Sequence, residues 1–312
     1  MTHLSNHMKL TMKMLRTLRI LLFQVAAFAM VVGDSLGADQ TPARQTGGFV
    51  LAGHAWTWNK GTLFEAIDQA AALGLDSLEI FLMGMRISAE TGDAVLDDAT
   101  PEELIARVRE HAKAKGVHFV APYIGGKQWT RIGQDEGQLR RFFEQGKKLG
   151  VSGFTGEPME SQWDMLEKLL KEYDFTFAIH NHAIGFQADY FGAPYPYGNP
   201  AETAKKLEAQ HRDKRMGICF DTGHAARSGL DIVEVTRACA GRLRSLHLKD
   251  VARVQVNDVP FGTGRVDVAA VLAELKRQGF QGHIGLEYEN FESPTFGDDL
   301  RQMVRFVRER GK

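Results

Sequence analysis

The chain has 312 residues, of which 44% are hydrophobic and 25% are charged, and its formal net charge is -1 at pH 7. A chain of this size and composition can build one α/β barrel or two smaller domains. The near-neutral charge removes any general electrostatic argument for nucleic-acid binding, so we expect a small-molecule partner.

The N-terminal segment has the layout of a secretory signal. Basic residues precede an apolar run, Ile20 to Val32, and small residues follow it; the basic residues are Lys9, Lys13, Arg16 and Arg19, and the small ones are Gly33, Ser35, Gly37 and Ala38. We predict a signal peptide over residues 1–38, cleaved near Gly37 or Ala38, and export to the periplasm or out of the cell. The alternative is an uncleaved anchor, but a membrane helix needs roughly 20 apolar residues. We therefore expect no stable membrane span after processing.

The chain contains two cysteines, Cys219 and Cys239. The first lies in a strand pattern and the second in a helix pattern, where a buried thiol is the usual state. No disulfide framework is expected.

From Gly47 onward, short apolar runs alternate with longer amphipathic stretches. Strands are predicted at Phe49–Gly53, Ser77–Phe81, His118–Pro122, Gly153–Glu157, Thr176–Asn181, Met216–Asp221, Arg244–Leu248 and His283–Glu287. Helices are predicted at Leu63–Leu73, Pro101–Lys115, Gln138–Leu149, Gln162–Glu172, Pro200–Ala209, Ile232–Ala240, Val268–Gln278 and Asp298–Arg308. Thr100 and Asn199 precede prolines as candidate helix caps, and a glycine follows several helices, at Gly74, Gly116, Gly150 and Gly279.

Eight strand–helix pairs indicate parallel strands with crossover helices. We predict a single-domain (β/α)₈ TIM barrel over residues 47–312, whose active site lies at the carboxyl ends of the strands. An open doubly wound sheet is the alternative. The long segment Gly185–Asn199 suits a substrate-covering loop, although its aromatic residues would equally suit a contact in a homo-oligomer.

Four side chains of metal-ligating type follow successive predicted strands: His180, Asp221, His247 and Glu287. The intervals between them are 41, 26 and 40 residues, the length of a strand with its helix and loops. Successive parallel strands would deliver all four to one rim of the barrel. This mixed nitrogen and oxygen set suits a divalent metal ion; we favour Mn²⁺, with Co²⁺, Zn²⁺ or Mg²⁺ as alternatives.

Four motifs in this order resemble the xylose isomerase-like barrels: DTGH, HLKD, the Gly262-Thr263-Gly264 turn and the terminal GLEYE. These barrels include sugar and sugar-phosphate isomerases and epimerases, inosose dehydratases and endonuclease IV-type enzymes. The resemblance covers about residues 48–310. In tagatose 3-epimerase-like members the metal is held by Glu, Asp, His and Glu, and both glutamates exchange protons with the sugar. Asp221, His247 and Glu287 match the last three.

The first ligand position falls on His180, which replaces a carboxylate that would act as acid or base. We expect Glu157 to supply the second acid/base beside Glu287; the alternative is that Glu157 is an acid at the start of the next helix. His182, two residues beyond His180, would project to the same face if the strand continues.

Further candidates for substrate binding follow other strands. The resemblance assigns His224 to a substrate contact, and a helix cap is its alternative. Lys249 and Asp250 could bind sugar hydroxyls or hold their loop. His54 and Trp56 could supply a polar contact and an apolar wall, whereas strand-end aromatics such as Tyr123 are more often packing residues. The amides of the turn at Gly262 could cradle an anion, but we favour a plain tight turn.

These observations predict a metal-dependent sugar isomerase or epimerase that works through an enediolate. The first alternative is a lyase or dehydratase that eliminates a β-substituent from a 3-keto sugar, a 3-keto-glycoside or an inosose. A non-catalytic sugar- or metal-binding barrel is the alternative of another class. Charge, export signal and the lack of histidine in Val251 to Pro260 oppose a DNA repair enzyme.

Overall fold

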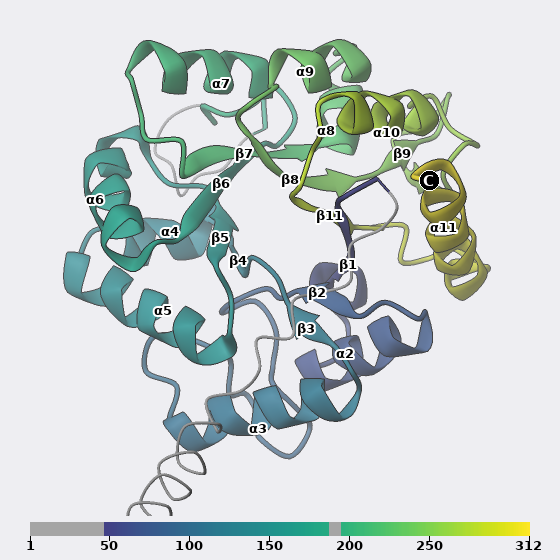
Figure 1. The fold of residues 1–312 in the computed structure, drawn as a ribbon. Coiled ribbons are helices and arrows are strands. Elements are labelled where there is room, and N and C mark those ends of the chain that lie inside the picture. The colour runs from purple at the N-terminus through teal and green to yellow at the C-terminus, as the bar shows by residue number, and fades with distance from the viewer. Residues whose placement is uncertain (1–46, 187–194) are drawn as a thin grey trace, which may run out of the picture. The chain divides into compact units, whose positions relative to one another are not determined.

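Nine parallel strands form one sheet within residues 47–186 and 195–312, which the computed structural model describes. Their hydrogen-bonded order is β3, β2, β1, β11, β8, β7, β6, β5 and β4. The bounds are β1 Val50–His54, β2 Ser77–Glu79, β3 His118–Phe119, β4 Tyr123–Ile124, β5 Gly153–Gly156, β6 Thr176–His180, β7 Met216–Asp221, β8 Leu243–Leu248 and β11 His283–Leu286. The strands form an inner ring in Figure 1.

The two ends of this order, β3 and β4, are parts of one strand that is interrupted before Tyr123. Pro122 lies at the break, where it has no N–H to donate. On either side, the amide of Val120 donates to the Leu78 carbonyl (3.1 Å) and that of Tyr123 to the Ile80 carbonyl (2.7 Å), so the segment that begins with β2 pairs with both halves. The ring is therefore closed, as the TIM barrel prediction requires, and the open doubly wound sheet is wrong.

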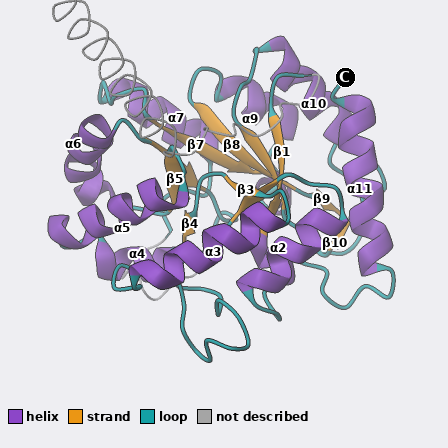
Figure 2. Ribbon diagram, turned by 60° about the horizontal axis from the view of Figure 1, so that its bottom comes forward, coloured by secondary structure: helices purple, strands orange, loops and turns teal. Residues whose placement is uncertain are grey.

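Helices surround the ring on its outer side (Figures 1 and 2). Their bounds are α2 Leu63–Ala72, α3 Glu102–Ala114, α5 Glu136–Leu149, α6 Trp163–Tyr173, α7 Pro200–Ala209, α9 Ile232–Ala238, α10 Val268–Arg277 and α11 Phe296–Arg310. The predicted ranges of β7 and α7 agree with the structure at both ends. The other ends differ mostly by one or two residues, the usual uncertainty of a helix or strand end.

Short elements that the sequence did not predict follow the carboxyl ends of several strands. They are the 3₁₀ turns η1 Ala55–Trp58 and η2 Glu160–Gln162, the helices α4 Gly126–Ile132 and α8 Thr222–Arg227, and the antiparallel hairpin of β9 Asp250–Val251 and β10 Asp258–Val259. These lie on the side of the barrel where the predicted ligands gather.

Most of the predicted helix caps and helix-ending glycines are confirmed. Asn199 caps α7 through a 3.1 Å hydrogen bond from the Ala201 amide. The four predicted glycines all have left-handed backbone, with φ of 70° at Gly74, 68° at Gly116, 78° at Gly150 and 65° at Gly279. The predicted cap at Thr100 is wrong: α3 starts after Pro101 without a side-chain cap, because the Thr100 hydroxyl accepts from the Asp97 amide instead (2.8 Å).

Both cysteines are buried free thiols, as predicted. The predicted signal segment, residues 1–38, lies outside the described residues, as do residues 187–194 of the predicted covering loop. In the part of the chain that is described, no helix has both the length and the apolar composition needed to cross a membrane.

Candidate metal centre

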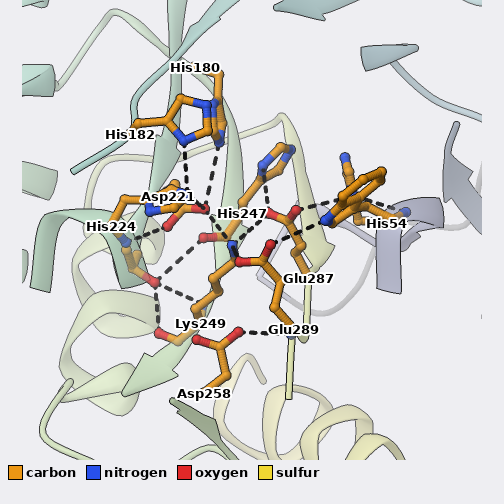
Figure 3. A network of polar contacts seen from close by, with 12 residues as sticks. His54, His180, His182, Asp221, His224, His247, Lys249, Asp258, Glu287 and Glu289 are labelled. Atoms are coloured by element: carbon orange, nitrogen blue, oxygen red, sulfur yellow. Dashed lines mark hydrogen bonds and ion pairs between the residues drawn. The ribbon is translucent and has the colours of Figure 1, made fainter. Parts of the chain in front are cut away.

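Four consecutive strands of the ring deliver the predicted ligands to one place. His180 ends β6, Asp221 ends β7, His247 lies in β8 and Glu287 follows β11. Each offers one ligand atom, these atoms all lie within 4.8 Å of one another, and all four residues are buried. Figure 3 shows their side chains converging from neighbouring strands. The four residues that the strand-end pattern selected therefore lie together in the structure.

The two carboxylate oxygens of Asp221 have different roles: one caps a helix and the other faces the site. Oδ1 accepts from the amide of His224 (2.7 Å) and so caps α8. Oδ2 faces His180 Nε2 at 3.6 Å and Lys249 Nζ at 3.0 Å. Burial alone would raise the pKa of Asp221, but His224, Lys249 and His180 hold it well below its usual range. Oδ2 is thus an ionised oxygen directed into the cluster.

Glu287 lies between His247 and His54. Its Oε2 is 3.1 Å from His247 Nδ1 and 3.0 Å from Lys249 Nζ, and its Oε1 is 3.6 Å from His54 Nδ1. Although burial opposes ionisation, Lys249, His54 and His247 lower the pKa of Glu287 well below its ordinary value. His54, a predicted substrate contact, is only 1% exposed and its ring packs 4.4 Å from that of His247. His54 is therefore a buried neighbour of both Glu287 and His247.

Lys249 is fully buried among carboxylates. Its ammonium lies 3.0 Å from Asp221, 3.0 Å from Glu287 and 2.6 Å from Glu289 (Figure 3). Burial would lower the pKa of Lys249, but these carboxylates raise it well above the usual value. Trp56, predicted as an apolar wall for the sugar, is linked to the carboxylates around Lys249, because its Nε1 donates to Glu289 Oε1 at 3.2 Å. Trp56 remains partly exposed.

Glu157 forms a second group of contacts beside His180. Its Oε1 lies 2.9 Å from His182 Nε2 and 3.5 Å from His180 Nδ1, and it also accepts from the Tyr123 hydroxyl. Oε2 is buried and makes no hydrogen bond with any described residue. Glu157 is 1% exposed, and the next helical turn starts only at Glu160, so the alternative of a helix-start acid is wrong.

The two histidines predicted as substrate contacts near the ligands, His182 and His224, contact each other. His182 Nδ1 lies 3.2 Å from His224 Nε2, although β6 has already ended at His180. His224 is not a helix cap, because Asp221 caps α8 and receives the amide of His224 itself. Tyr195, from the described end of the predicted covering loop, donates its hydroxyl to the His180 carbonyl (2.7 Å).

The amides of the turn at Gly262 bind a carboxylate of the chain itself, that of Asp250. The fully buried carboxylate of Asp250 accepts from its neighbour's amide at Val251 (2.8 Å) and from Gly262 (3.0 Å), Gly264 (2.9 Å) and Val266 (3.0 Å). A Cβ on Gly264 would lie 2.2 Å from Asp250 Oδ1, so only glycine permits this approach. Asp250 therefore holds the loop and does not face a sugar.

The four converging groups fit a divalent cation. His180 Nε2 and His247 Nδ1 are buried and make no hydrogen bond with the described residues. Asp221 Oδ2 and Glu287 Oε2 also lack a well-formed hydrogen bond, and Lys249 is their ionic partner. The two buried ring nitrogens, which have no hydrogen-bond partner among the described residues, call for an explanation such as an ion, and two imidazoles with two carboxylates suit Mn²⁺, Co²⁺ or Zn²⁺.

Comparison with known proteins agrees with this geometry. Residues 67–310 match the family model described as the xylose isomerase-like TIM barrel. The chain belongs to this family. The inosose dehydratase of Mesomycoplasma hyopneumoniae (strain 7448) is 29% identical over 110 residues, which make up 34% of this chain and 33% of that protein. The chain thus matches about a third of that relative's length.

Solved structures share the fold of this xylose isomerase-like barrel. D-allulose 3-epimerase from Methylomonas sp. superposes with a TM-score of 0.63 at 17% identity, over 86% of this chain and 100% of that one. The IOLI protein, whose structure carries a zinc atom, superposes with a TM-score of 0.62 at 17% identity, over 84% and 98%.

Three acidic or phenolic groups of this xylose isomerase-like barrel were not predicted at the site. The sequence leaves Tyr123 open between a sugar contact and packing, the commoner role, and its hydroxyl in fact donates to Glu157. Glu289 lies two residues beyond Glu287, a spacing that could have indicated the same face. Glu79 is fully buried in β2, and an acid within the apolar run SLEIF was the available signal.

Proposed function

We propose that the protein is a divalent-metal-dependent isomerase or epimerase of sugars. The observation that carries the proposal is the set of four buried ligand atoms, from His180, Asp221, His247 and Glu287, that lie within 4.8 Å of one another. The likeness in fold to an epimerase and to a zinc-containing protein supports it. We favour Mn²⁺ as the cation, with Zn²⁺, Co²⁺ and Mg²⁺ as alternatives.

A cation held there would polarise adjacent carbonyl and hydroxyl oxygens of a sugar and acidify the C–H between them. The chain must then accept this proton and return it to another face or another carbon. We assign these steps to Glu287 and Glu157. Glu157 uses Oε1 for Tyr123 and His182, which leaves its buried Oε2 for the substrate. Burial opposes ionisation of Glu157, but His182 and His180 lower its pKa, so it stays ionised and can accept a proton.

We further propose a sugar without phosphate. The ammonium within the cluster, Lys249, is fully buried and is ion-paired with three carboxylates, so a phosphate would have to compete with these carboxylates for it. The partly exposed Trp56 and Phe81, whose rings lie 5.0 Å apart edge to face, could contact the apolar face of a sugar ring.

The test is chelation followed by reconstitution with single metals, and measurement of deuterium uptake from D₂O into a panel of keto sugars. We expect one metal to restore exchange and Glu287→Gln to abolish it. A protein that binds metal tightly but shows no exchange with any sugar would favour the non-catalytic binding barrel.

The lyase is the second candidate, and the match to inosose dehydratases favours it. The same proton abstraction would then be followed by expulsion of a β-substituent. Mass spectrometry of the products separates the two reactions, because an epimerase leaves the substrate mass unchanged whereas a dehydratase removes water from it.

We also propose that residues 1–38 direct export and are removed. The support is the order of basic, apolar and small residues in that segment. Mass spectrometry of the protein recovered from the native host should give a mature chain that begins near residue 38; an intact N-terminus on a cytoplasmic protein would contradict the proposal.

A further inference from the structure

Glu79, at the end of β2, is a buried carboxylate that the proposed chemistry does not use. It is 0% exposed, and its Oε2 lies 2.8 Å from His283 Nε2 and 3.2 Å from His247 Nε2. Two imidazole nitrogens thus face this one carboxylate oxygen, and a carboxylate oxygen accepts hydrogen bonds from ring N–H groups. Glu79 is therefore an acceptor that faces the imidazole of a proposed metal ligand.

His247 has one carboxylate at each ring nitrogen. Nδ1 faces Glu287 at 3.1 Å, inside the proposed ligand cluster, and Nε2 faces Glu79 at 3.2 Å. A ligand nitrogen must offer a lone pair, so the ring has to carry its hydrogen on the other nitrogen. Metal-bound histidines usually donate this second N–H to a carboxylate or a carbonyl, which also fixes the orientation of the ring.

Glu79 reaches His247 across the space that Gly285 leaves by having no side chain. His283, Gly285 and Glu287 alternate along one face of β11, so Gly285 lies between the two ends of this network. A Cβ on Gly285 would lie 3.3 Å from Glu79 Oε2 and 3.5 Å from His247 Cδ2. The missing side chain thus leaves the space in which the carboxylate from β2 meets the imidazole from β8.

Glu79 could instead be a metal ligand, because His54, Glu79 and His247 also offer three atoms within 4.8 Å. The tautomer of His54 opposes this. The Trp56 amide donates to His54 Nδ1 (3.3 Å), which places the hydrogen of a neutral His54 on Nε2. A ring nitrogen that accepts from a backbone amide carries no hydrogen, so His54 is neutral in this geometry. His54 Nε2 then carries a hydrogen and offers no lone pair to a metal. Neither this nitrogen nor Glu79 Oε1 has a hydrogen-bond partner in the described chain.

We propose that Glu79 is a positioning residue that accepts the Nε2 hydrogen of His247 and so directs the Nδ1 lone pair toward Asp221 and Glu287. The contact is 3.2 Å long but not aligned as a hydrogen bond, so the proposed role requires the His247 ring to turn toward Glu79 when the metal binds. The same arrangement recurs at His180, whose Nε2 faces Asp221 at 3.6 Å while Nδ1 faces Glu157 at 3.5 Å. This inference rests on the metal site of the proposed function.

The test measures Zn²⁺ affinity and stoichiometry by chelator competition for the wild type, Glu79→Gln, Gly285→Ala and the control Glu274→Gln. The control removes a buried carboxylate on α10 whose hydrogen bonds go to Arg277 and Gln278. Loss of the carboxylate behind a metal-bound histidine weakens metal binding about 10- to 100-fold. We expect that loss for Glu79→Gln and a smaller one for Gly285→Ala, with Glu274→Gln like the wild type.

Selective ¹⁵N-histidine NMR provides a readout that a purely structural role would not move. His247 Nε2 should carry a hydrogen in the wild type with and without Zn²⁺, whereas an Nε2 without hydrogen overturns the inference even if no variant folds. Unchanged Zn²⁺ affinity in Glu79→Gln overturns it and leaves the metal site intact. Two Zn²⁺ ions in the wild type and one in Glu79→Gln overturn it by making Glu79 a ligand. A wild type that binds no metal defeats the proposed function, while the NMR result still decides the role of Glu79.

Discussion

Lys249 neutralises part of a cluster in which carboxylates outnumber ammonium groups. Asp221, Glu287 and Glu289 all lie within 3.0 Å of its ammonium, and Lys249 is fully buried. The ammonium also gives the two proposed carboxylate ligands a common partner. The charge of this single residue therefore offsets the repulsion between three carboxylates that lie close together.

Lys249→Met is expected to destabilise the protein by about 3–5 kcal/mol, because removal of one partner leaves buried charges uncompensated. Urea unfolding in the presence of EDTA measures this loss. Lys60→Met is the matched control, since its ammonium pairs with Glu292 at the surface, and it should change stability little. Equal stability of the two variants would contradict the role assigned to Lys249.

His54 makes stability depend on pH in a defined window. Burial lowers its pKa to about 4 in the folded protein, against an ordinary value of 6.5. Between these values the unfolded chain binds more protons, so falling pH favours unfolding. From pH 7 to pH 5 the wild type should lose on the order of 2 kcal/mol more than His54→Asn. Urea unfolding at both pH values tests this; parallel losses in the two proteins would refute it.

At the scale of the element, one carboxylate organises the segment between β8 and α10. The Asp250 carboxylate accepts hydrogen bonds from four backbone amides, three of them between Gly262 and Val266, and so closes the loop beside the hairpin β9–β10. The motif glycine at Gly264 serves this contact, because any Cβ would overlap the carboxylate. The loop needs no bound ligand for its shape.

Asp250→Asn is expected to cost about 2–4 kcal/mol, because an amide group cannot accept at both positions and a buried donor is left unpaired. Hydrogen exchange should accelerate at the amides of Gly262, Gly264 and Val266, whereas the amides of α5 should show only the global change. Equal acceleration in both regions would mean that Asp250 acts on the fold as a whole.

At the scale of the whole molecule, the proposed metal joins four neighbouring strands of the closed ring, β6, β7, β8 and β11. A ligand that binds only the folded barrel stabilises it by about 2.7 kcal/mol at 100 times its Kd. We expect Mn²⁺ or Zn²⁺ to raise the unfolding temperature of EDTA-treated protein by several degrees. His180→Ala should lose most of this shift; a shift of full size in that variant would exclude His180 as a ligand.

Much of the barrel could be predicted because the information is local. Alternating apolar runs, glycines such as Gly150 and caps such as Asn199 mark each unit, and parallel strands place their carboxyl ends together. His180, Asp221, His247 and Glu287 could be selected from strand ends alone, without knowledge of any contact. Thr100 shows the limit of this approach, since a cap sequence was present but its hydroxyl found another partner.

Local sequence patterns are enough to predict the order of strand and helix, the closed barrel that this order favours and the four residues at one rim. The groups around those residues come from distant parts of the chain: Glu79 lies 204 residues from His283, and the ammonium of Lys249 is shared by acids from two other strands. Such contacts depend on strand register, on a gap at Gly285 and on the burial of charge. These are properties of the closed ring, and no short stretch of sequence contains them.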